Sequence, residues 1–290
     1  MRKDFLRLSL ALIILIFIFY IFQQKEIAKE SITYFPIDPS VTFPKASTSL
    51  EYNKKRFDEY SIFWKTQSSI NKQAYLRQDM SFLFANGKLI STMGEWKQNK
   101  MELAEEKSII ESKSSLFQAV SFHFAEVHDS NGSIFSSQRI SGDTLFVVNS
   151  TYDDKPFVFH TPKSNVEEEW KQELISETDD YIEFAYKSVL NKFGISLEDY
   201  HTRILLSDLT QFNDSRINLF SQEQTAEIIG QLTEGLYKNY FLGITKIDGS
   251  TISPIGSSMP VILIANNHLL VLFITESKEP VVLRQQISNL

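Results

Sequence analysis

Two histidines flank a glutamate in the stretch His123-Phe-Ala-Glu-Val-His128, which offers ligands of the kind that a metal ion uses. Zinc-binding helices place such histidines four residues apart, so that both imidazoles lie on one face. Here the two histidines are five residues apart. On the strand that we expect in this region, that spacing puts them on opposite faces. We therefore interpret His123 and His128 as polar positions of a half-exposed strand, and we assign no metal site and no cofactor.

The stretch Ser69-Ile-Asn-Lys72 matches the Ser-x-x-Lys pattern of serine acyl enzymes that act on cell walls. On a helix, a lysine one turn away can accept the proton of a serine nucleophile. The companion Ser-Asp-Asn and Lys-Thr-Gly elements are missing, and the sequence contains no Gly-x-Ser-x-Gly elbow and no phosphate-binding glycine loop. We assign no catalytic residue, and we keep Ser69 and Lys72 as the basis of an alternative function.

A third stretch, Gly235 to Gly243, concentrates aromatic residues between two glycines at an expected junction of a helix and a strand. Such a segment could line a pocket. Core packing is the simpler interpretation, because aromatic side chains bury large apolar surfaces.

The composition limits the classes of function. The chain has a net charge of -7, with 42% hydrophobic and 22% charged residues, which is typical of a protein with a folded core. The acidic balance argues against a phosphate-binding surface, so we expect no nucleic-acid partner. There is no cysteine, which excludes disulfides, thiolate metal sites and a cysteine nucleophile.

The first residues indicate a membrane anchor. Residues 8–24 are almost entirely apolar and contain no charge, and a spanning helix needs roughly 20 apolar residues with about 17 as the lower limit. A cleaved signal peptide would show a small-x-small pattern at a cut site after the apolar run, and residues 23–29 after Phe22 do not contain one. We predict a retained transmembrane helix at 8–24, with a cleaved and secreted protein as an alternative.

The charges around this helix predict its orientation. Arg2, Lys3 and Arg7 precede it, and positive residues tend to stay in the cytoplasm. We therefore expect a cytoplasmic tail at 1–7 and place the remainder of the chain outside the membrane. The protein would be a single-pass protein of the cell membrane, in a bacterial envelope.

The residues after the helix allow two interpretations. Pro36, Pro39 and Pro44 lie within residues 25–49, and prolines at this spacing favour a semi-rigid extended stalk. The alternative is a strap in which Tyr34, Val41 and their apolar neighbours pack on the domain. We assign residues 25–49 to the stalk and residues 50–290 to an extracytoplasmic domain.

The first part of this domain is predicted to contain one helix and an antiparallel meander. Thr48-Ser-Leu-Glu51 has the spacing of a capping box, which predicts a helix after Thr48. Hydrophobic residues then alternate with a period of two over residues 75–150, and turns are expected at Asn86-Gly87 and Asn131-Gly132. Residues 151–165 form a punctuated connection and a possible boundary within the domain.

The second part is predicted to alternate helices with strands. Helices are expected after the capping boxes at Ser164 and Ser221, the first ending at Gly194. The apolar runs at 261–265 and 269–274 predict central strands covered on both faces. The fold class is therefore α+β: antiparallel meanders with about three packed helices, after one transmembrane helix.

These observations favour a non-catalytic function. We expect a membrane-anchored binding or accessory module of the bacterial envelope, which contacts the membrane through its N-terminal helix and has an envelope protein as a possible partner. The alternatives are a cell-wall serine hydrolase or acyltransferase that uses Ser69 and Lys72, and a secreted protein whose N-terminus is removed. The sequence indicates neither the ligand nor the oligomeric state.

Overall fold

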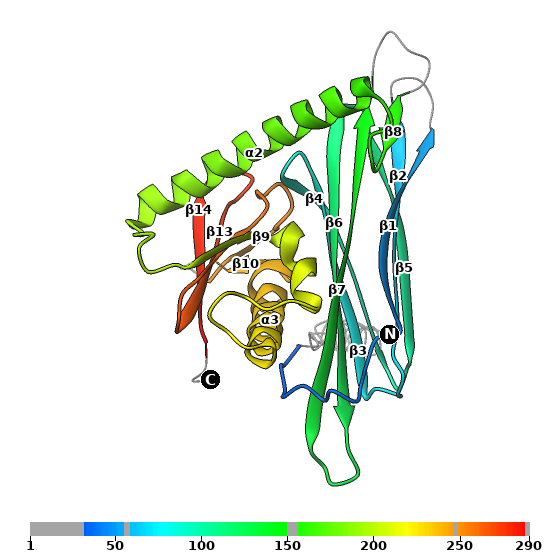
Figure 1. Cartoon of the computed structure of the whole chain (residues 1–290), viewed down its shortest axis with the longest axis vertical. Coiled ribbons are helices and arrows are strands. Elements are labelled where there is room, and N and C mark those ends of the chain that lie inside the picture. Colours follow the sequence, from blue (N-terminus) through cyan, green and yellow to red (C-terminus); the bar gives the residue numbers. More distant parts are fainter. Residues whose placement is uncertain (1–31, 55–58, 150–155, 246–248, 288–290) are drawn as a thin grey trace, which may run out of the picture. The chain divides into compact units, whose positions relative to one another are not determined.

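The longest strands form an antiparallel sheet of five strands in the order β4-β3-β6-β7-β8 (Figure 1). This computed structural model describes residues 32–54, 59–149, 156–245 and 249–287. Asn86 and Gly87 form the turn between β3 and β4 with φ values of 47° and 74°, which confirms the predicted hairpin. The sheet confirms the predicted antiparallel strands but not their order as a meander, because β3 lies between β4 and β6. The bounds of its strands are Leu76–Ala85 (β3), Lys88–Gln98 (β4), Ser115–His128 (β6), Ile134–Val148 (β7) and Phe157–Phe159 (β8).

A second antiparallel sheet consists of β1 (Lys45–Lys54), β2 (Tyr60–Ser69) and β5 (Glu102–Glu111), in the order β1-β2-β5. The helix predicted after Thr48 is therefore wrong. Every second residue of β2 is buried from Tyr60 to Ser68, a period of two that the aromatic residues of this region concealed. The spacing of a capping box was present, but the burial of alternate residues determined the local structure.

Residues 32–44, called the strap here, pack along the domain instead of leaving it as a free stalk. The amide nitrogen of Asp38 donates to the carbonyl oxygen of Ser136 in β7 (3.0 Å), and that of Ser136 donates to Pro36 (2.9 Å). Ile32 and Val41 are buried. Residues 32–44 thus follow the strap interpretation, and β1 occupies all of residues 45–49. Residues 25–31 lie outside the described residues.

The last third of the domain forms a four-stranded antiparallel sheet in the order β14-β13-β12-β9. The two apolar runs are its central strands, as predicted, and are buried on both faces. A two-stranded ladder, β10 with β11, precedes them. The bounds of these strands are Thr202–Leu205 (β9), Ile244–Thr245 (β10), Thr251–Ile252 (β11), Val261–Ile264 (β12), His268–Ile274 (β13) and Pro280–Gln286 (β14).

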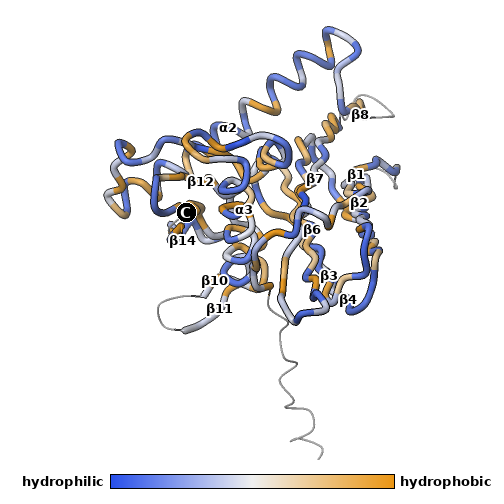
Figure 2. The backbone as a smooth tube through the Cα atoms, turned by 60° about the horizontal axis from the view of Figure 1, so that its bottom comes forward, coloured by the Kyte–Doolittle hydropathy of each residue, from blue (hydrophilic) through white to orange (hydrophobic). Residues whose placement is uncertain are grey.

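Within the described residues, three helices pack against the sheets, which confirms the α+β class. They are α2 (Asn165–Phe193), the 3-10 helix η1 (Leu206–Asn213) and α3 (Gln222–Leu236), which continues into the π-helical turn η2 (Tyr237–Phe241). Ser164 caps the start of α2 and Gly194 caps its end, both as predicted. It crosses the four-stranded sheet and reaches the ends of β6 and β7 (Figure 1). Hydrophobic and hydrophilic residues alternate along it, so one face packs on the domain (Figure 2).

Residues Ile32–Leu290 form one compact unit. Its largest apolar cluster fills the space between the five-stranded sheet, the helices and the four-stranded sheet. A smaller cluster lies between the five-stranded and three-stranded sheets. The transmembrane helix predicted at 8–24 falls outside the described residues, and no helix within them is long and apolar enough to span a membrane.

Candidate functional site

The structure does not bring Ser69 and Lys72 together as a catalytic pair. Ser69 is the last residue of strand β2, so the helical spacing that the mechanism requires is absent. Lys72 instead holds the strap: its Nζ donates to Ser40 Oγ (2.6 Å) and lies 3.8 Å from Asp38 Oδ2. Two hydrogen bonds from Ser40, helped by Lys72, lower the pKa of the Asp38 carboxyl below its usual value.

His123 and His128 point to opposite faces of β6, as the sequence predicted, but their surroundings differ more than expected. His128 is partly exposed and stacks on Tyr75, with ring centroids 4.1 Å apart. His123 is 1% exposed, so the expectation of a half-exposed position is wrong for it. Among the described residues, no group of three or more His, Asp or Glu side chains could hold a metal ion.

His123 belongs to a hydrogen-bonded chain between the two β-sheets. Its Nδ1 lies 2.8 Å from Asp79 Oδ2, and its Nε2 lies 2.8 Å from Ser141 Oγ. The chain continues through Thr48 and Ser121, whose hydroxyls are linked at 2.6 Å. The four strands β1, β3, β6 and β7 therefore contribute to one buried polar network.

Arg77 completes this network and supplies its positive charge. The side chain is fully buried, and it donates to Ser68 Oγ, which in turn donates to Asp79 Oδ2 (2.7 Å). Its guanidinium also lies over the ring of Phe43 in the strap, 5.1 Å from the ring centroid. Burial lowers the pKa of Arg77, and the nearby Asp79 carboxylate opposes that change.

Asp79, His123 and Ser141 occur in the order acid, base and hydroxyl that serine hydrolases use. The surroundings do not suit catalysis, because a nucleophile must reach a substrate in an open site. Ser141 is only 9% exposed, and its hydroxyl is already bonded to Thr48 and His123. None of the three residues lines a hollow described below. We therefore interpret the network as an element that aligns the two sheets.

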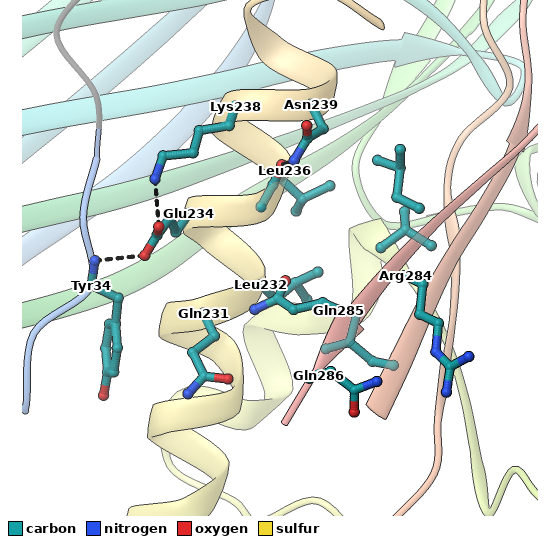
Figure 3. A pocket seen from close by; sticks show the side chains of 14 residues that line it. Tyr34, Gln231, Leu232, Glu234, Leu236, Lys238, Asn239, Arg284, Gln285 and Gln286 are labelled. Carbon is teal, nitrogen blue, oxygen red and sulfur yellow. Dashed lines mark hydrogen bonds and ion pairs between the residues drawn. The ribbon is translucent and has the colours of Figure 1, made fainter. Parts of the chain in front are cut away.

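Two hollows lie side by side along α3, on either side of Tyr34 in the strap. The first, of about 430 Å³, lies between α3 and the strands β13 and β14 (Figure 3). The second, of about 750 Å³, lies between α3 and the strap. Both are lined by Tyr34 and Gln231. We call the two hollows together the Tyr34 groove. Its volume is in the range of ligand-binding sites.

The first hollow combines an apolar floor with a polar rim. Leu232, Leu236 and Leu283 contribute to the floor. The rim is rich in side-chain amides and carries Arg284, which Figure 3 shows beyond β14, on the side away from Tyr34. Its polar residues are Gln231, Glu234, Lys238, Asn239, Arg284, Gln285 and Gln286. Amides can donate and accept at once, so this rim suits a ligand that presents both donors and acceptors, such as a peptide backbone.

Tyr34 is fixed at the centre of the groove by α3. Its amide nitrogen donates to Glu234 Oε2 (2.8 Å), and the other oxygen of Glu234 pairs with Lys238 (Figure 3). Its ring lies directly on Gly230, where a Cβ atom would come within 1.9 Å of the ring. Burial raises the pKa of the Tyr34 hydroxyl, and the carboxylates of Glu227 and Glu223 raise it further.

Sequence reasoning located only part of this groove. The stretch from Gly235 to Gly243 does contribute Gly235, Lys238 and Asn239 to the first hollow, while its Tyr240 is buried in the core as the simpler interpretation held. The strap and β14 were not expected to meet α3, because nothing in their local pattern indicates that contact.

Comparison with known proteins adds no relative to this description. No family model matches the sequence, and no curated protein matches it at a significant level. The assignment of a function therefore rests on the geometry of the groove and on the pattern of the sequence.

Proposed function

We propose that this protein is a membrane-anchored binding module of the bacterial envelope, and that it holds its partner in the Tyr34 groove. The observation that carries the proposal is the groove itself: two adjoining hollows of about 430 and 750 Å³ with an apolar floor and an amide-rich rim. Such a combination is typical of a recognition site, where apolar contact supplies affinity and a few polar groups supply specificity.

Binding is favoured over catalysis by the placement of the reactive side chains. Lys72 is engaged with the strap and not with Ser69. The hydroxyl of Ser141 lies in the sealed interior between two sheets. The groove itself holds Glu234 and Lys238 as a mutual ion pair, with Nζ and Oε1 2.5 Å apart, which satisfies both charges without a substrate.

The membrane location rests on the sequence. Residues 8–24 are long and apolar enough for one span, and the basic residues before them favour a cytoplasmic N-terminus. The strap, which carries Tyr34 of the groove, follows this segment closely in the sequence. A neighbouring envelope protein is the partner that such a position favours.

The first experiment measures where the chain resides and at what length. Cells are fractionated, and the intact mass of the protein is determined in each fraction. We expect the full-length chain in the membrane fraction. A form in the medium that lacks roughly the first 25–30 residues would overturn the anchor.

The second experiment tests the groove in the same cells. A photo-crosslinking amino acid is placed at Asn239, on the rim of the first hollow, and in a matched control at Ser108, an exposed residue of β5. We expect a discrete crosslinked product from position 239 and none from position 108. Equal products from both positions would show that the groove is not the binding site.

A further inference from the structure

Strand β14 is an edge of the four-stranded sheet, and one side of its backbone is unpaired. The amide nitrogen of Ile287 donates to Asn267 in the turn before β13 (2.9 Å), which fixes the phase of the ladder. Paired residues alternate along an antiparallel ladder. The backbone groups of Val282, Arg284 and Gln286 therefore point outward, and they have no partner among the described residues.

This edge lacks the protection that another long edge of the domain carries. β5 is also an edge strand, but it holds four glutamates and a lysine among its ten residues, and charge on an edge discourages further pairing. β14, Pro280-Val-Val-Leu-Arg-Gln-Gln286, has one charge in seven residues. The domain already adds a segment to a free edge elsewhere, because the strap pairs with β7 through Ile37 and Ser136.

The first hollow lies beside this edge on one face of the sheet. Leu283 and Gln285 line it from β14, and Leu232 and Leu236 line it from α3. Side chains alternate between the two faces of a strand. A strand added to β14 would therefore direct every second side chain toward the hollow, where an apolar residue would meet leucines.

Arg284 borders the same hollow, but it alternates with Leu283 and Gln285 along β14, so its side chain extends from the opposite face of the edge (Figure 3). This side chain is exposed and forms no ion pair within the described residues. A peptide residue on that face would lie near the guanidinium, and a carboxylate there would be favoured.

We propose that the outer edge of β14 binds an extended peptide of a partner protein by strand addition, with an apolar side chain in the first hollow and an acidic side chain beside Arg284. This proposal rests on the proposed binding function and names the chemistry of the partner. Main-chain hydrogen bonds supply the affinity in this mode of recognition, and alternate side-chain pockets supply the specificity.

A second copy of this chain fits the edge less well. Pairing two β14 strands about a twofold axis centred near Arg284 or Leu283 brings the two Arg284 side chains opposite or diagonal to each other. Like charges in those positions are destabilising. The two copies would also both carry the net charge of -7.

The test uses the purified full-length protein in detergent micelles and a phage-displayed library of random linear dodecapeptides. Peptides that the selection enriches are synthesised, and their dissociation constants are measured. We expect the enriched sequences to share apolar residues at alternate positions with an acidic residue between them. Hydrogen exchange should show new protection at the amides of Val282, Arg284 and Gln286, while the inward amides of Leu283 and Gln285 change little.

Two matched proline variants test whether the peptide binds at the outer edge of β14. The amide of Val282 points outward, so Val282→Pro removes a donor that the fold does not use, and proline is tolerated at such positions. Ser108→Pro makes the same change on the outer side of β5, where the bond from the Ile70 amide to the Met101 carbonyl fixes the phase. We expect Val282→Pro to weaken binding about tenfold or more and Ser108→Pro to leave it unchanged.

Two further measurements keep the proposal open to refutation if Val282→Pro disturbs folding. An enriched peptide that is N-methylated at alternate residues should lose its binding to the wild-type protein, and Arg284→Glu should reverse the preference for an acidic residue. Selection without enrichment, or equal binding of the methylated peptide, overturns the proposal. A wild-type dimer that Val282→Pro converts to a monomer would assign the edge to a second copy instead. Because these assays use purified protein, their outcome is separate from the fractionation result.

Discussion

The two faces of the five-stranded sheet are both buried, yet they are built from different kinds of residue. Toward α3 and the four-stranded sheet, β3 contributes Met80, Phe82 and Phe84 to an apolar core. Toward β1 and β2, the same strand contributes Arg77 and Asp79, both buried almost completely. One strand therefore supplies an apolar interior on one side. On the other side it supplies a charged, hydrogen-bonded interior beside an apolar cluster that contains its Leu83 and Ala85.

This difference shows two ways in which a sheet can hold its neighbours. Apolar contact is non-directional and proportional to the area buried, so it stabilises without demanding one alignment. Hydrogen bonds require a partner at each position. Thr48 of β1 and Thr66 of β2 both bond to Ser121 of β6, at 2.6 and 3.0 Å. We infer that the polar face fixes the alignment of the two sheets, because a shift would leave buried hydroxyls unpaired.

Among the substitutions that test this comparison, Asp79→Ala is expected to lower the free energy of unfolding strongly. The Nη2 atom of Arg77 lies 3.6 Å from Asp79 Oδ1, and both side chains are buried. Removal of the carboxylate leaves a buried guanidinium without its counter-ion. Breaking a buried ion pair from one side costs about 3–5 kcal/mol, so the free energy of unfolding should fall by that amount. Urea unfolding followed by circular dichroism measures the change.

The control replaces the pair instead of breaking it. Replacing a buried ion pair by apolar residues of similar volume is often neutral, so Arg77→Met with Asp79→Leu should cost much less than Asp79→Ala alone. A loss for the single variant below about 1 kcal/mol would show that the pair behaves like an exposed one, and the distinction between the two faces would fail.

An intermediate effect is expected at Gly230, on the apolar side. A Cβ atom there would lie 1.9 Å from the Tyr34 ring, so Gly230→Ala must displace the strap from α3. Overpacking of this kind costs about 1–3 kcal/mol in the free energy of unfolding. In a Tyr34→Ala background the same substitution should cost nothing or stabilise α3, since alanine favours helix formation over glycine. An equal cost in both backgrounds, measured by urea unfolding, would contradict the contact.

Local signals predicted several elements of the fold well. The turn at Asn86-Gly87, the cap at Ser164 and the two apolar runs of the last sheet each act within a few residues, and all were confirmed. The same kind of signal failed at Thr48. There a capping-box spacing competed with a period of two, and pairing with β2 decided in favour of the strand.

The buried network could not be predicted in the same way. Asp79, His123 and Ser141 are separated by 44 and 18 residues, and only the register of three strands brings them together. The sequence contains one indication of the network: Arg77 and Asp79 share the face of β3 opposite to its phenylalanines. From the sequence, that face of the sheet was expected to be exposed to solvent, because no sequence feature showed that β1 and β2 would cover it.

Glu105 provides the last test, and it distinguishes the two interiors by pH. The side chain lies on β5 beside the polar face, and its Oε1 atom is buried without a hydrogen-bond partner in the part of the chain that the structure describes. Burial raises the pKa of its carboxyl from 4.5 to about 8, and the carboxylates of Asp79 and Glu95 add to the rise.

The sign of the pH dependence follows from these two values. The folded state binds the Glu105 proton more tightly than the unfolded state does, so stability is lost as pH rises from about 4.5 to about 8. Glu105→Gln mimics the protonated form. Its Tm should match the wild type near pH 5, exceed it increasingly toward pH 8, and keep a constant advantage above that. Glu106→Gln, an exposed change on the next residue, should show no widening difference. A parallel pair of Tm curves for Glu105→Gln would show that this interior does not hold a neutral carboxyl.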